Sequence, residues 1–276
     1  MIELPEAVVI AAQMDRELKG KRIVAGNRGN SPHKFAFYTR EPAEYEALLP
    51  GKTVGASEAQ GNAIVTALEP GYVMVLGTGG ERILLHENAS TLPKKYQLLL
   101  QFGDGAYLTV SIQGWGSAML LTEEEAKTHS ILKPKGPSPL SDEFTWEYFR
   151  GLFEGIAPED KRAVKYFLIS EPGVWGLGNG YTQDILFRAR LHPRRRVMDT
   201  SEAERRALYD AVVGVLREAV EQGGRDDELG LHGEPGRYKR TLNSKVVGQP
   251  CPRCGGVVEK IGFLGGSSYF CAGCQV

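Results

Sequence analysis

Residues 251–274 read CPRCGGVVEKIGFLGGSSYFCAGC and contain all four cysteines of the chain. Cys251 and Cys254 form one C-x2-C pair, Cys271 and Cys274 form the other, and sixteen residues separate the two pairs. This spacing is typical of a tetrahedral four-cysteine zinc site on a short hairpin. Since four protein ligands leave no open position for water, we expect one structural Zn²⁺ that stabilises a hairpin too small for its own core. Disulfide pairing is the alternative, and it fits poorly with a cytosolic chain that has no other cysteine.

A glycine-rich turn precedes this hairpin in the chain, within GLGNGYTQDILFRARLHP at residues 176–193. Its three glycines, of which Gly178 is the central one, predict a tight non-helical turn, with Asn179 at the start of the following helix. Backbone N–H groups and a side-chain amide in such a turn favour a phosphate ligand. A plain connection between two helices is the alternative.

The chain divides into four segments by composition. Residues 1–132 begin with a helix and continue as short extended runs separated by glycine, which predicts an antiparallel β-sandwich or barrel-like domain. Residues 133–140, KPKGPSPL, form a proline-rich linker. Residues 141–242 show helical periodicity at 158–169, 181–191 and 201–224, and residues 243–276 form the zinc hairpin. The expected fold class is α+β in several domains.

Charge is distributed unevenly, although the net charge of the chain is only −1. Between Lys161 and Arg206, ten lysines and arginines face five acids. This excess is typical either of a phosphate-binding surface or of a solvated helical face. The sequence has no apolar run of membrane length and no signal-peptide pattern, so we expect a cytoplasmic protein, monomeric, with no membrane partner.

The N-terminus reads MIELPEAVV. Pro5 and Glu6 suit the first turn of a helix, because proline needs no N–H donor there and an acid favours the positive end of the helix dipole. On this pattern alone, Glu3 is an exposed acid without a function.

Three segments together resemble the formamidopyrimidine-DNA glycosylase and endonuclease VIII family of base-excision repair enzymes: MIELPE, GLGNGYTQDILFRARLHP and CPRCGG…YFCAGCQ. The resemblance covers the whole chain and includes the order of its domains. It implies an N-terminal β-sandwich with flanking helices, followed by a helix–two-turn–helix domain that carries the zinc hairpin. It also implies double-stranded DNA containing a lesion as the partner, in the nucleoid, with the damaged nucleotide flipped into a pocket near the N-terminus.

The resemblance carries roles to particular positions. Glu3 matches the catalytic glutamate beside the attacked sugar. This match replaces the interpretation of Glu3 as an exposed acid without a function. The phosphate-binding positions of the family correspond to Asn179, in its turn with Gly178, and to Lys165.

Three positions depart from the family pattern. Ile2 stands where the family has the proline whose amine is the nucleophile. A bulky second residue leaves the initiator methionine in place, so we expect a primary amine at Met1, displaced by one residue from the usual nucleophile. Asn62, in QGN, stands where the family has a catalytic lysine, and we expect it to contact DNA. Gly266 stands where the family has a phosphate-binding arginine at the tip of the hairpin.

The residues that fill the space left by a flipped base also differ. Ala89 falls near the methionine of the family, while Gly114 and Trp115 fall near its Arg-Phe pair. Trp115 is therefore a candidate aromatic wedge, with a buried core tryptophan as the alternative. His33, in the loop SPHKFAF, is a candidate replacement catalytic group, with a solvated loop histidine as the alternative.

Three functions are compatible with these residues. The first is a DNA glycosylase in which Glu3 assists hydrolysis of the base–sugar bond without a proline Schiff base and without efficient strand cleavage. The second is a catalytically inactive protein that binds damaged DNA. The third is a zinc-ribbon protein that binds RNA or another protein, which the full-length resemblance disfavours.

Overall fold

The computed structural model describes residues 1–276, which divide into two compact units. Unit 1 comprises Met1–Pro134 and Val220–Tyr238, and unit 2 comprises Lys135–Ala219 and Lys239–Val276. The boundary after Pro134 falls in the expected linker. Residues 220–238 belong to unit 1 and not to the helical domain in which the sequence pattern placed them, because the backbone N–H of Arg225 donates to Glu6 and that of Leu85 donates to Leu231. No helix is both long and apolar enough to cross a membrane.

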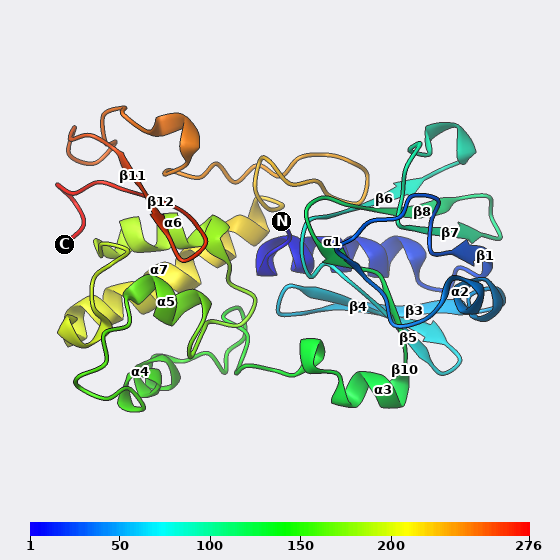
Figure 1. Ribbon diagram of the computed structural model, residues 1–276, viewed down its shortest axis with the longest axis horizontal. Helices are drawn as coiled ribbons and strands as arrows, with labels where there is room; N and C mark the ends of the chain where they lie inside the picture. The colour runs from blue at the N-terminus through cyan, green and yellow to red at the C-terminus, as the bar shows by residue number, and fades with distance from the viewer. The chain divides into compact units, whose positions relative to one another are not determined.

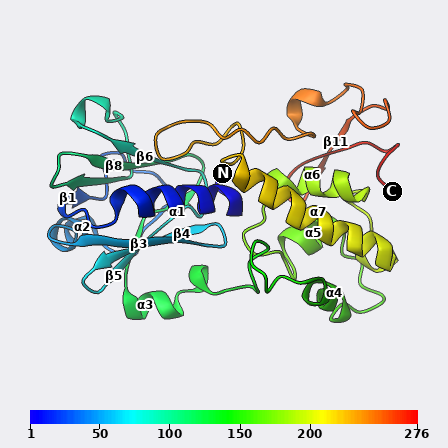
Figure 2. The same ribbon diagram turned by 180° about the vertical axis from the view of Figure 1, so that it is seen from behind.

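Unit 1 contains two four-stranded antiparallel sheets, and helix α1 (Leu4–Leu18) runs between them (Figures 1 and 2). One sheet has the strand order β1-β7-β8-β6 and the other has the order β10-β5-β4-β3. The expected β-sandwich is confirmed. The strands of the two sheets are β1 (Ile23–Asn27), β3 (Thr53–Gln60), β4 (Ala63–Glu69), β5 (Tyr72–Leu76), β6 (Glu81–His86), β7 (Leu98–Phe102), β8 (Tyr107–Ile112) and β10 (Met119–Thr122).

Two very short strands, β2 (Ala36–Phe37) and β9 (Gly116–Ser117), form a separate parallel pair in unit 1. The remaining elements of this unit are short helices, which lie in the connections: α2 (Pro42–Leu48), η1 (Ala89–Thr91), α3 (Glu123–Thr128) and η2 (Ser130–Leu132).

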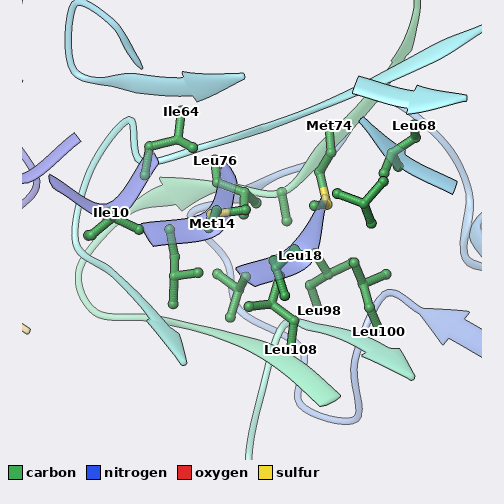
Figure 3. Close-up of a cluster of buried hydrophobic side chains, with 14 of the residues drawn as sticks. Ile10, Met14, Leu18, Ile64, Leu68, Met74, Leu76, Leu98, Leu100 and Leu108 are labelled. Atoms are coloured by element: carbon green, nitrogen blue, oxygen red, sulfur yellow. The ribbon is translucent and has the colours of Figure 1, made fainter. Parts of the chain in front are cut away.

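The core of unit 1 forms around α1, as Figure 3 shows. Ile10, Met14 and Leu18 recur at helical spacing and are at most 2% exposed. They pack against side chains from both sheets, including Leu68, Met74, Leu76, Leu98, Leu100 and Leu108. Burial of each such side chain stabilises the fold by about 1.5–3 kcal/mol, so the apolar face of α1 fixes the helix, and with it the N-terminus of the chain.

Unit 2 consists of helices and the C-terminal hairpin, as the sequence predicts, with one shift in a boundary. Residues 158–163 are not helical, because Arg162 binds Asp160 and Ala163 pairs with Arg196 as an isolated bridge. The elements of this part of the chain are α4 (Trp146–Glu154), α5 (Val164–Ile169), α6 (Asn179–Ala189), η3 (Val197–Asp199), α7 (Glu202–Glu221, which continues into unit 1), η4 (Ser244–Val246), β11 (Glu259–Phe263) and β12 (Gly266–Phe270).

Candidate functional site

Glu3 lies at the N-cap of α1 and is only 4% exposed. Its carboxylate accepts a hydrogen bond from the backbone of Glu6, and its own N–H donates to the Glu6 carboxylate at 3.0 Å. This reciprocal capping box satisfies backbone donors at the helix start. Glu3 is therefore not the exposed acid that the local pattern alone suggests.

Arg225 inserts its guanidinium between the two acids of this cap. Its Nη1 lies 3.1 Å from Glu3 Oε1, and its Nε lies 3.2 Å from Glu6 Oε1. All three side chains are at most 5% exposed, so water screens these ion pairs only weakly. Sequence reasoning missed Arg225. One signal in the sequence could have indicated such a partner. Two acids lie three residues apart at the start of an apolar helix, and acids that are buried there need a cation.

The first two residues are held by the same cluster. The α-amine of Met1 forms an ion pair with Glu228, and the Met1 carbonyl accepts a hydrogen bond from Arg225. The side chain of Ile2 is in the core at 2% exposure, and its N–H donates to the carbonyl of Gly79 at 2.7 Å. The α-amine is therefore engaged by Glu228.

The segment Thr78–Gly79 contacts two other candidate residues. Asn62 lies in the turn between β3 and β4, and its amide donates to the carbonyl of Thr78 at 3.2 Å. A Cβ atom on Gly79 would lie 2.9 Å from Cε3 of Trp115, so the indole ring covers the backbone of residue 79. Trp115 is itself 41% exposed, so its interpretation as a buried core residue is wrong.

The buried carboxylate of Glu81 holds the segments that carry these residues. It accepts hydrogen bonds from the backbone N–H groups of Thr78 at 3.0 Å, Gly79 at 2.7 Å and Ser117 at 2.7 Å. Burial raises the pKa of Glu81, and these hydrogen bonds oppose that rise. Glu81 was also missed by sequence reasoning, because its partners come from two separate segments, the connection between β5 and β6 and the strand β9.

Three other candidates have no hydrogen bond or ion pair with the N-terminal cluster. His33 accepts a hydrogen bond at Nδ1 from the backbone of Phe35 at 3.3 Å, inside its own loop. Ala89 begins η1 and is exposed. Gly114 has a φ of +76°, a conformation that favours glycine over the arginine of the family pattern.

In unit 2, helix α6 begins at Asn179, with Gly178 as its N-cap, as the sequence predicts. Asn179 is exposed, and its amide donates to the carbonyl of Ser267 in the hairpin at 3.1 Å. Gly266 packs on the same amide, because a Cβ atom there would lie 3.4 Å from Asn179 Nδ2. The helix N-terminus and the tip of the hairpin therefore meet at one surface, where the positive end of the helix dipole favours an anion.

Lys165 is fully buried beneath this surface. Its Nζ donates to the carbonyl of Phe263 and to the hydroxyl of Ser268, each at 2.9 Å. Burial lowers the pKa of this amine. Lys165 thus fixes the hairpin against α5, and a direct contact with phosphate stays a prediction.

The other cations of the predicted basic stretch are partly or fully exposed. Five of its arginines form ion pairs with acids, whereas Lys161, Arg190 and Arg194 are exposed and form none. Arg194 lies with its guanidinium carbon 5.3 Å from the ring centroid of Phe263 in the hairpin. These three side chains are available to bind phosphate.

The four cysteines form one compact ligand set. Their sulfur atoms lie within 4.8 Å of one another, with 3.6 Å between Cys251 and Cys274 and 3.6 Å between Cys254 and Cys271. These distances are too long for disulfides, so that alternative is wrong, and all four are free thiols. A tetrahedral zinc with Zn–S bonds of about 2.3 Å separates its sulfurs by about 3.8 Å, so the set fits a single structural metal ion.

Comparison with known proteins agrees with this arrangement. Three family descriptions match the chain: the formamidopyrimidine-DNA glycosylase N-terminal domain at residues 1–112, the formamidopyrimidine-DNA glycosylase H2TH domain at 135–228, and the zinc finger found in FPG and IleRS at 248–276. The chain is 31% identical to a formamidopyrimidine-DNA glycosylase of Bacillus licheniformis over 100% of this chain and 99% of the relative. It is 32% identical to the protein of that name from Geobacter metallireducens, with all of both chains covered.

Solved structures share the fold. A Lactococcus lactis Fpg in complex with abasic-site DNA matches with a TM-score of 0.86 at 22% identity, over 99% of both chains. A complex of the same protein with FAPY-dG DNA matches with a TM-score of 0.85. With the residues and the architecture in agreement, the chain belongs to the formamidopyrimidine-DNA glycosylase family of DNA N-glycosylases.

Proposed function

We propose that this protein removes a flipped, damaged base from double-stranded DNA by hydrolysis, and that Glu3 is the carboxylate that acts at the sugar. The N-terminal cluster carries the proposal. Glu3 is present at the start of α1, whereas the amine of Met1 is ion-paired to Glu228 and Ile2 is anchored in the core. The similar proteins from Bacillus and Geobacter are named for action on formamidopyrimidine lesions, which are therefore the first substrates to test.

In this mechanism the carboxylate of Glu3 orients and deprotonates a water molecule and stabilises positive charge that develops on the sugar. The water oxygen bonds to C1′ as the bond between C1′ and the base breaks, and the base leaves with that electron pair and takes up a proton. No amine nucleophile is required, and the product is an intact abasic site. Arg225 serves as a positioning residue, because its contact with Glu3 at 3.1 Å fixes the carboxylate and balances part of its charge. To accept a proton from water, Glu3 has to exchange one of its contacts with Arg225 or with the helix cap.

Binding to DNA uses unit 2. Asn179 and Gly178 present the N-terminus of α6 to a phosphate, and Lys161, Arg190 and Arg194 supply exposed cations. The cysteine ligand set holds zinc, which stabilises the hairpin and takes no part in the reaction. The protein acts as a monomer on nucleoid DNA in the cytoplasm.

One observation favours a second function, the recognition of damaged DNA without base removal. Glu3 is 4% exposed, and its carboxylate contacts both Arg225 and the backbone of the helix cap. A carboxylate that is buried and held by these contacts is poorly accessible to water. This environment is the one expected of a residue that only caps the helix.

A panel of lesion-containing duplexes, incubated with and without borohydride, separates these functions. We expect base release with an intact abasic site and no trapped adduct, and loss of release in Glu3→Gln. Glu46→Gln is the matched control, because Glu46 is an exposed acid of unit 1 without an ion pair, and it should keep full activity. A covalent adduct at Met1 would refute the water mechanism, and tight lesion binding without release of any base would favour the second function.

A further inference from the structure

Three cations of unit 1, Arg82, Lys94 and Lys95, are exposed and have no acidic partner. None of them forms an ion pair, and none forms a hydrogen bond through its side chain. Other cations of the same unit are neutralised, as Lys19 is by Asp15 and Lys21 by Asp104. An exposed cation without an acid beside it keeps its full charge for a binding partner.

Strand pairing brings the three cations to one end of the sheet β1-β7-β8-β6. Arg82 in β6 pairs with Ser111 in β8, and the hydroxyl of Ser111 donates to the carbonyl of Lys95 at 3.1 Å. Lys94 and Lys95 lie just before β7, the strand next to β8 in the sheet. We call the surface formed by Arg82, Lys94 and Lys95 the basic patch.

Two polar side chains fix the segment that carries the lysines. The side-chain amide of Asn30 donates to the carbonyl of Lys94 at 3.1 Å. Gln97 is 5% exposed; its amide donates to the carbonyl of Ser31 at 2.9 Å, and its oxygen accepts the N–H of Ile112 at 2.7 Å. Because this backbone is already held in place, the basic patch loses less conformational freedom when it binds a partner.

The segments that form this end of the sheet contain almost no acids. Residues 88–103 and 105–122 contain no Asp or Glu, and residues 18–40 contain six cations and no acid. Glu81 precedes Arg82, but its carboxylate is buried and accepts backbone N–H groups, whereas Arg82 points to solvent. In a chain whose net charge is −1, such a local excess of positive charge is typical of a phosphate-binding surface.

The basic patch adjoins the N-terminal cluster within unit 1. The N–H of Gly79 donates to Glu81 at 2.7 Å, and the carbonyl of Gly79 accepts the N–H of Ile2 at 2.7 Å. Arg82 therefore follows directly on the segment that anchors Ile2, the residue before Glu3. A polyanion bound to the patch would lie beside the start of α1.

We propose that Arg82, Lys94 and Lys95 bind the phosphate backbone of duplex DNA, so that unit 1 has a DNA-binding surface of its own in addition to that of unit 2. Such contacts carry no sequence information, but they add affinity and fix the position of the duplex beside Glu3. The inference rests on the proposed DNA function and extends it, because the basic stretch from Lys161 to Arg206 lies wholly in unit 2.

The test measures the affinity of the full-length protein for a duplex with an abasic-site analogue at several salt concentrations. Each phosphate contact contributes about 0.9 to the slope of log affinity against log salt concentration. The triple variant Arg82→Gln, Lys94→Gln and Lys95→Gln should therefore lower this slope by about 2.7, and each single variant by about 0.9. The losses should be similar for all DNA sequences, and the melting temperature should not change, because all three side chains are exposed.

The matched control is the triple variant Arg16→Gln, Lys19→Gln and Lys127→Gln. It removes the same number of charges from exposed side chains of unit 1, and each of these cations is already bound to an acid. The control should keep a slope close to that of the wild-type protein. Equal reductions in the control and in the patch variant would overturn the inference, because the overall charge and not the patch would then set the slope.

A second readout locates the contacts on the DNA. Single phosphates of the duplex are replaced in turn by uncharged methylphosphonates, and each position bound by the patch should matter for the wild-type protein but not for the patch variant. A wild-type slope and a wild-type pattern of sensitive phosphates in the patch variant would overturn this inference and leave the proposed function intact. Failure of the wild-type protein to bind the duplex at any salt concentration would overturn both.

Discussion

The most informative perturbation is the replacement of Arg225 by methionine, which keeps an apolar stem of similar length and removes the charge. In the native protein the guanidinium lies 3.1 Å from Glu3 and 3.2 Å from Glu6, and all three side chains are at most 5% exposed. The substitution therefore leaves two buried carboxylates without their shared cation.

The distances give the size of the effect. At an effective dielectric constant of about 20, each contact corresponds to an attraction of about 5 kcal/mol. Most of this attraction offsets the cost of removing the charges from water, and deletion of one partner of a buried pair costs about 3–5 kcal/mol. Because a domain has a total stability of about 5–15 kcal/mol, Arg225→Met should lower the melting temperature of unit 1 by roughly 6–20 °C.

Calorimetry and urea unfolding at pH 7 provide the assay. Arg217→Met is the matched control, since Arg217 is exposed on α7 and forms no ion pair, and it should change stability by less than about 0.5 kcal/mol. The combination of Arg225→Met with Glu3→Gln and Glu6→Gln should recover much of the loss, because no buried charge is then left unpaired. If Arg225→Met costs no more than the control, this account of the N-terminal cluster is wrong.

Four further outcomes follow from the structure. Glu81→Gln should destabilise the loop that carries Trp115, because an amide NH₂ would face backbone N–H donors, and hydrogen exchange at Gly79 and Ser117 would report it. Burial lowers the pKa of His86, so the unfolded chain binds more protons; stability should fall as the pH drops through about 6.5, and His86→Gln should reduce that slope in acid titration, with His192, whose pKa burial also lowers, supplying the rest. Removal of zinc by a chelator, or Cys254→Ser, should loosen the hairpin and weaken DNA binding before any effect on chemistry, as metal analysis and binding assays can show. Asn179→Ala should weaken binding equally for all DNA sequences, because the proposed contact is with the backbone, and unequal losses across a set of duplexes would argue against this role.

The sequence by itself determined the features that depend on local spacing. Two C-x2-C pairs predict a metal site because the ligands within each pair are three residues apart, and the four sulfurs do lie within 4.8 Å of one another. The start of α6 at Asn179 was predictable because the glycine-rich turn before it cannot continue a helix. Alternation of apolar residues, punctuated by glycine, likewise indicated the β-sandwich.

Only the tertiary structure decided how the site is assembled. Arg225 binds Glu3 across 222 residues of chain, and no periodicity or motif connects positions so far apart. Trp115 could be read as a buried residue or as an exposed wedge, and its 41% exposure depends on how the β2–β9 pair is placed. Lys165 became a buried hairpin contact because Phe263 and Ser268 fold back onto α5. In each case the environment of the side chain is set by residues that are distant in sequence, and a charge or a ring acquires its role only from that environment.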